Sequence, residues 1–176
     1  NPPPGYWTGT PTGGIPFLVR ELMRSLEMDG APPTAVEAAR IAELGPEVVT
    51  RSVASRLGRQ SASARQLCSA VAVLGGEAEL QQAAALASLD LETALGDVDA
   101  LAGAELLTPE RAGAVRFVHP IVHAAVYADL SAAEKERRHE AAARLLAADG
   151  RPAEQVAAHL MRLHPRGDDW IAETLL

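Results

Sequence analysis

Apolar residues recur at three- and four-residue steps through most of this 176-residue sequence, and glycine or proline follows several of these stretches. Val49, Val53 and Leu57 form one row, and a second begins at Leu91 and Leu95. This spacing puts the apolar side chains on one face of an α-helix, whereas a half-buried strand would alternate. Only 3% of the residues are aromatic, so small side chains must fill the core, which suits closely packed helices. The chain is therefore predicted to be mainly α-helical.

Capping residues and breakers place the expected helix ends. Proline suits a first turn, serine or aspartate a helix start, and glycine a helix stop. Ser61 or Ser63 can cap one helix and Asp90 another, while Ser131 and Glu134 form a capping box ahead of an alanine-rich helix. We expect helices over residues 16–30, 46–58, 61–74, 80–86, 90–103, 119–126, 131–148 and 152–163, and a last one capped by Asp168.

Two short β-prone segments interrupt the helical pattern. Leu106–Thr108 and Val115–Val118 are separated by residues 109–114, which include Pro109 and Gly113, so we expect a hairpin. Three closely spaced helices precede it, and three helices followed by a hairpin wing predict a winged helix over residues 61–130. The antiparallel helices expected after residue 130 are typical of the start of a helical-repeat array.

The charge pattern bears on possible partners. Acidic residues outnumber basic ones by 23 to 16, and the net charge is -7. The third helix of the predicted winged helix carries Asp90, Glu92, Asp97 and Asp99 without any lysine or arginine, so DNA phosphates would repel it. No run approaches the roughly 18 apolar residues that a membrane span needs. We therefore expect a protein module that contacts neither nucleic acid nor membrane.

No catalytic or metal-binding pattern emerges. Lys135 is the only lysine and stands between two glutamates, so the chain cannot contain a P-loop. His119 and His123 are four residues apart, a spacing that can bind one metal ion, but no third ligand is near. No serine lies in a Gly-x-Ser-x-Gly turn. The single Cys68 excludes an internal disulfide and suits a reduced, cytoplasmic compartment. We expect neither an enzyme nor a metal site.

Two segments taken together resemble a known family. Residues 12–22 read Thr-Gly-Gly-Ile-Pro-Phe-Leu-Val-Arg-Glu-Leu, similar to the Gly-Gly-Asn-Pro-Phe-Leu-Val-x-Glu-Leu segment of the large ATP-binding regulators of the LuxR family. Residues 115–130 read Val-Arg-Phe-Val-His-Pro-Ile-Val-His-Ala-Ala-Val-Tyr-Ala-Asp-Leu, similar to their Phe-x-His-x-Leu-Val-x-x-Ala-Val-Tyr segment. The resemblance leaves only residues 1–11 unmatched. Ile15 departs from the family's asparagine and removes a side chain that could cap the helix.

These regulators are STAND-type ATPases related to AAA+ proteins, with a nucleotide-binding domain, a helical lid, a winged helix, a helical-repeat sensor and usually a DNA-binding domain. The resemblance implies a fragment in which residues 1–11 are an extended linker from the missing nucleotide-binding core and 12–60 form the helical lid. Residues 61–130 are then the winged helix, and 131–176 a helical linker and the start of the repeats. The expected partners are the parent protein's own upstream and downstream domains, and ATP or ADP with Mg²⁺ binds the parent rather than this fragment.

Two residues acquire a role from the resemblance. In the wider STAND group, the proline of a Gly-x-Pro turn lies against the adenine, and Pro16 matches it. A histidine just after the wing reaches the β-phosphate of ADP, and His119 occupies that position. Judged without the family, His119 would be a helix-start residue satisfied by local backbone. A phosphate contact there makes chemical sense, because a helix N-terminus with free amides and an imidazole donor can hold an anion without lysine.

Two functions follow as hypotheses. The first is a regulatory middle module of a bacterial ATP-dependent transcriptional regulator, which couples the ADP or ATP state to downstream sensor and DNA-binding domains. The alternative is a stand-alone helical protein-interaction scaffold that never binds nucleotide. The proline-rich start without methionine suggests a piece of a longer protein and favours the first. A Gly-x-x-x-x-Gly-Lys-Ser/Thr motif shortly upstream in the gene would separate the two.

Overall fold

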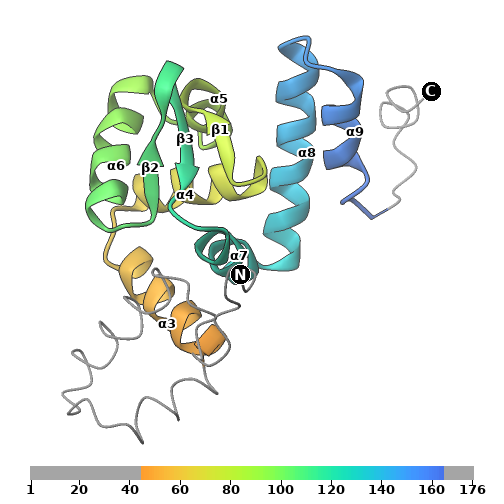
Figure 1. Cartoon of the computed structure of the whole chain (residues 1–176). Coiled ribbons are helices and arrows are strands. Elements are labelled where there is room, and N and C mark those ends of the chain that lie inside the picture. Colours follow the sequence, from red (N-terminus) through yellow and green to blue (C-terminus); the bar gives the residue numbers. More distant parts are fainter. Residues whose placement is uncertain (1–44, 165–176) are drawn as a thin grey trace, which may run out of the picture.

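The computed structural model describes residues 45–164. This part of the chain is mainly helical with one small antiparallel sheet, as the sequence predicts (Figure 1). Its elements, in chain order, are α3 (Gly45–Gly58), α4 (Ala62–Val73), β1 (Glu77–Glu79), α5 (Leu80–Leu86), α6 (Leu91–Gly103), β2 (Leu107–Pro109), a 3-10 turn (Arg111–Gly113), β3 (Ala114–Phe117), α7 (Pro120–Asp129), α8 (Ala132–Ala148) and α9 (Ala153–Leu160). Pro16, the first expected helix and the cap at Asp168 lie outside the described residues.

The caps explain why the helices begin where they do. Ser61 accepts a hydrogen bond from a backbone amide of the first turn of α4, and Asp90 does the same for α6. At α8, both halves of the capping box between Ser131 and Glu134 are present. Each such cap satisfies an amide that the helix itself leaves without a partner. The caps predicted at Asp90 and Ser131 are confirmed, and Ser61 is the one that caps α4.

The three strands form a sheet in the order β1-β3-β2, with both pairs antiparallel. The predicted hairpin is confirmed, because Leu107 pairs with Phe117 across β2 and β3. The strand β1 is not predicted by the sequence, since Glu-Ala-Glu contains no β-branched or aromatic residue. It pairs with β3 and turns Ala78 towards the core while its two glutamates face outwards.

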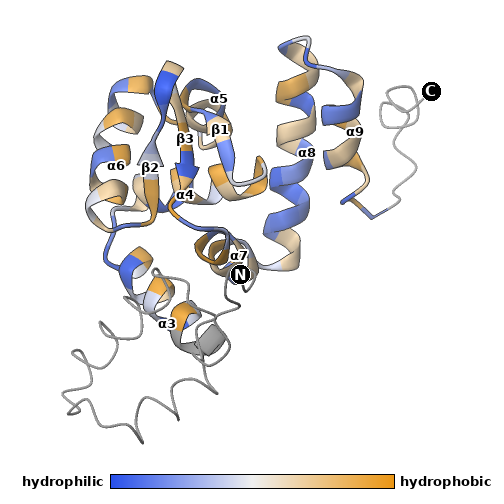
Figure 2. Ribbon diagram, in the orientation of Figure 1, coloured by the Kyte–Doolittle hydropathy of each residue, from blue (hydrophilic) through white to orange (hydrophobic). Residues whose placement is uncertain are grey.

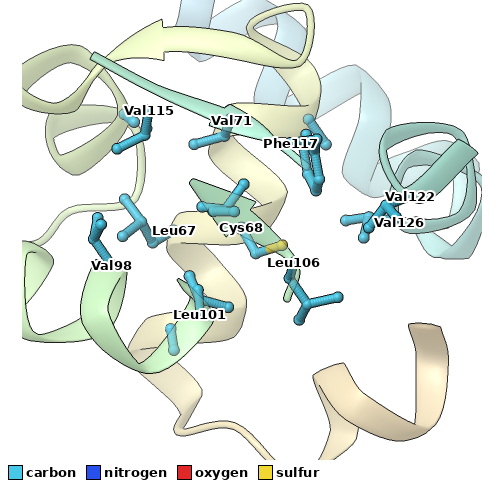
Figure 3. Close-up of a cluster of buried hydrophobic side chains, with 14 of the residues drawn as sticks. Leu67, Cys68, Val71, Val98, Leu101, Leu106, Val115, Phe117, Val122 and Val126 are labelled. Carbon is cyan, nitrogen blue, oxygen red and sulfur yellow. The ribbon is translucent and has the colours of Figure 1, made fainter. Parts of the chain in front are cut away.

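The main hydrophobic core surrounds α4, whose residues from Leu67 to Val73 are all buried. Side chains from α4, α6, the sheet and α7 converge there (Figure 3). Cys68 lies in this core with no exposed surface, and burial raises the pKa of its thiol to about 12. A thiol that stays protonated at neutral pH is a poor nucleophile, so Cys68 acts as a small core residue.

The helices α8 and α9 lie side by side and run antiparallel at one edge of the molecule (Figure 1). Their contact is a small apolar cluster of its own: Ala143, Leu146, Val156, Leu160 and the partly buried Leu163. The expected antiparallel pair is therefore confirmed, although α9 ends at Leu160, earlier than the expected Leu163. A third cluster of Val73, Leu130 and Ala142 joins α8 to α4.

Two polar contacts tie helices to one another. The guanidinium of Arg56 in α3 donates to the carbonyls of Ala104 and Glu105, both at 3.2 Å, just after α6. Asp97 of α6 is only 8% exposed, and its Oδ1 accepts hydrogen bonds from the hydroxyls of Ser61 and Ser63. Asp97 therefore anchors α6 to the start of α4.

Candidate functional site

His119, the described member of the predicted nucleotide contacts, lies where β3 leads into α7. It is half-buried and caps the helix, because its Nδ1 accepts a hydrogen bond of 3.2 Å from the amide of Ile121. Its carbonyl accepts from the amides of Val122 and His123 at 3.0 and 3.3 Å. Pro120, the first residue of the helix, has no amide hydrogen to offer.

The start of α7 therefore differs from the expected anion site. The amides that were expected to be free are already engaged, by the ring or the carbonyl of His119. A phosphate at this place would have to be met by the imidazole itself, through Nε2, because Nδ1 is occupied as the cap acceptor. The expectation of free amides is wrong, while the position of His119 directly after the sheet is as predicted.

His123 does not share a site with His119. Its Nε2 donates a hydrogen bond of 2.9 Å to the carbonyl of Ala72 at the end of α4. The ring is held against Gly76, where an added Cβ would lie 3.2 Å from it, and the φ angle of +94° also favours glycine there. Within residues 45–164, no three histidine, cysteine, aspartate or glutamate side chains are grouped closely enough to hold a metal ion.

A row of aromatic rings crosses the boundary between α7, α8 and α9. We call His123, Tyr127, His139 and His159 the imidazole–tyrosine cluster; successive ring centroids are 6.2, 5.9 and 5.1 Å apart. The hydroxyl of Tyr127 is hydrogen-bonded to Nε2 of His139 at 2.8 Å. On its other side, Nδ1 of His139 is 2.9 Å from Nδ1 of His159. His139 thus bridges α7 and α9 with both of its ring nitrogens.

The electrostatics around His139 and His159 favour neutral imidazoles. His139 is only 4% exposed, and burial, followed by the neighbouring His159 and Arg162, lowers its pKa to about 4. Burial and then Arg162 also lower the pKa of His159. The contact between the two Nδ1 atoms needs one proton donor and one acceptor, which two neutral rings of opposite tautomer supply. Protonation of both rings would leave two donors facing each other.

A cleft of about 240 Å³ lies beside the cluster. It is lined by the end of α4, by parts of α7 to α9 and by Arg162 just after α9. Most of the polar side chains along it are already hydrogen-bonded to one another or to backbone, so the cluster links three helices rather than presenting reactive groups. Sequence reasoning missed this cluster because its members come from three helices and have no common spacing.

No protein-family model, curated protein or solved structure matches the chain. No helix within the described part of the chain has both the length and the apolar character needed to span a bilayer.

Proposed function

We propose that this chain is a regulatory middle module of a bacterial ATP-dependent regulator of the LuxR family. In this role it couples the ADP or ATP state of an upstream nucleotide-binding domain to a downstream sensor and DNA-binding region. The observation that carries the proposal is the position of His119. It follows the central strand β3 and caps the next helix, α7. Any movement caused by a contact to this side chain would directly displace the end of the sheet and the start of α7.

A winged helix is the fold that we propose for residues 61–130. The order α4-β1-α5-α6-β2-β3, with β3 in the centre of the sheet, supports it, because three helices then pack against a hairpin and one added strand. The helix that would enter a DNA groove is α6, in which Glu92 and Asp99 are exposed, as is its cap Asp90, and which has no basic residue. Like charge opposes its approach to phosphates, so we propose a protein module rather than a DNA reader.

His119 is the residue proposed to register the nucleotide. In the closed arrangement its Nε2 would donate to the β-phosphate of ADP, while Nδ1 continues to cap α7. A donor that is present in one arrangement and absent in the other shifts the population between the two. Pro16 is proposed to lie against the adenine, and Mg²⁺ and the P-loop would belong to the upstream domain.

The first test uses the full-length gene product with His119→Asn. Asparagine is a good helix cap but is too short to replace the reach of imidazole, so the variant separates capping from phosphate contact. We expect ADP affinity to fall about tenfold, the effect of losing one hydrogen bond to a charged group, and transcription to begin without inducer. The matched control is His164→Asn, a change in a side chain that is 81% exposed, which should leave ADP affinity unchanged.

Two outcomes would contradict the nucleotide role of His119. His119 would be only a helix cap if His119→Asn left both the ADP affinity and the melting temperature unchanged while His119→Ala lowered the melting temperature. Absence of a P-loop motif upstream in the gene would instead favour the stand-alone interaction scaffold.

A further inference from the structure

The outer side of α6 exposes apolar residues that the fold does not use. We call Leu91, Glu92, Leu95, Gly96, Asp99 and Ala100 the α6 outer face; all six are exposed. Leu91 is 44% and Leu95 54% exposed, whereas most large apolar side chains among the described residues are buried. The helix mixes apolar and polar residues along its length (Figure 2). Its buried side, by contrast, is formed by Ala94, Asp97, Val98 and Leu101.

The spacing of these residues suits a second helix. Leu91, Leu95 and Asp99 form one row at four-residue steps, and Glu92, Gly96 and Ala100 form the neighbouring row. Two leucines of the first row therefore lie beside a row that is shallow at Gly96 and Ala100, and helices pack by fitting ridges of side chains into such grooves.

Gly96 provides a separate observation. A Cβ added at Gly96 would meet no atom within 4 Å, so packing inside the molecule does not require glycine there. Glycine in the middle of a helix lowers helix stability compared with alanine. A residue that the fold does not need, and that weakens the helix, is explained if another backbone approaches it closely.

Charge selects the kind of partner. Glu92 and Asp99 are exposed on α6, as is its cap Asp90; α6 contains no lysine or arginine, and the whole chain carries a net charge of -7. Nucleic acid, an anionic membrane and the same face of a second copy would all meet like charge. A partner with cations beside its apolar side chains would instead neutralise the carboxylates that docking desolvates.

We propose that the α6 outer face binds a cationic amphipathic helix of a partner protein. The apolar side chains of that helix lie against Leu91 and Leu95, and its arginines pair with Glu92 and Asp99. The close approach is made over Gly96. This inference does not depend on the nucleotide role of His119, which lies on a different element.

The test uses a synthetic peptide in place of the partner. The probe is a fluorescein-labelled amphipathic helix with leucines at i, i+4 and i+7 flanked by arginines, and its twin carries glutamates at the arginine positions. Fluorescence anisotropy with the 176-residue chain should show binding of the arginine peptide only. Leu95→Ser should weaken this binding about tenfold, a typical effect at a central contact. Met161→Ser is the matched control, because Met161 is 80% exposed but lies after α9, and it should leave binding unchanged.

Each other outcome overturns the proposal. Equal binding by the Leu91→Ser, Leu95→Ser and unaltered chains would show unspecific attraction between opposite charges. Self-association in sedimentation that Leu95→Ser abolishes would identify a second copy as the occupant. Binding of duplex DNA that Asp99→Asn strengthens would identify a nucleic-acid surface. None of these results changes ADP affinity in the His119 variants, so the two proposals fail separately.

Discussion

The core around α4 and the imidazole–tyrosine cluster hold the molecule together in different ways. The core is built from aliphatic side chains, Phe117 and one protonated thiol, and most of its members have almost no exposed surface. The cluster joins α7, α8 and α9 through hydrogen bonds between rings, and the apolar clusters beside it have few members. The core therefore holds the sheet to its helices mainly through apolar contacts, whereas the cluster connects that unit to the α8–α9 pair through hydrogen bonds of His139.

This difference determines what can break each region. Apolar burial is roughly proportional to area and does not depend on proton concentration, so only a loss of volume weakens the core. Hydrogen bonds between imidazoles require particular tautomers, so a single proton or a single missing hydroxyl weakens the cluster. Changes to a core leucine, to the pH and to the tyrosine hydroxyl test this contrast, from the largest expected effect to the smallest.

Leu67→Ala should have the largest effect on stability. Leu67 has no exposed surface and lies at the centre of the core, so the change removes buried area and leaves a cavity. We expect the free energy of unfolding to fall by about 2–5 kcal/mol in urea titrations. Leu95→Ala is the control, because Leu95 is 54% exposed and the loss should be below about 0.5 kcal/mol. Equal losses in the two variants would contradict the assignment of the core.

Acid should weaken the cluster. The pKa of His139 is lowered from 6.5 to about 4 in the folded chain, so between these values the unfolded chain binds more protons. The free energy of unfolding is therefore undiminished by this group above about pH 6.5. It falls by up to about 3 kcal/mol as the pH falls towards 4. Urea titrations at both ends of this range should show the loss. His139→Gln should remove most of this dependence, and an identical slope in both proteins would assign it to other groups.

Tyr127→Phe should have a smaller effect at neutral pH. The variant keeps the ring but removes the hydroxyl that is hydrogen-bonded to Nε2 of His139 at 2.8 Å. We expect a loss of about 1–2 kcal/mol, because a buried polar nitrogen is left without its partner. His164→Ala, at a side chain that is 81% exposed, should change stability by less than about 0.5 kcal/mol. If Tyr127→Phe left the free energy of unfolding unchanged, the hydroxyl would contribute nothing to stability.

The elements that the sequence predicts correctly depend on neighbours along the chain. Apolar spacing, the caps at Asp90 and Ser131, and glycine stops all act within a few residues, and α3 to α9 follow them. The strand β1 escapes prediction because its pairing partner, β3, lies far along the chain. A three-residue segment of glutamate and alanine becomes a strand only when that partner is in place.

The same distinction applies to the candidate site. His119 could be placed before α7 from its own neighbours, but the engagement of the nearby amides depends on the geometry of the first turn. Pairing of His139 with Tyr127 and His159 depends on how three helices pack, so no local pattern indicates it. The burial of Asp97 similarly depends on Ser61 and Ser63, which precede it by 36 and 34 residues.

The strand order β1-β3-β2 links the sheet to the direction of protein synthesis. Its central strand, Ala114–Phe117, is the last of the three to leave the ribosome, so both outer strands emerge before their shared partner exists. The helices α4 to α6 can form earlier from local contacts, but contacts between distant segments form only when both are available. A nascent chain that ends before Ala114 lacks Val115 and Phe117, which cover part of the core. Completion of this small sheet therefore precedes closure of the core, which also needs Val122 and Val126 of the following helix α7.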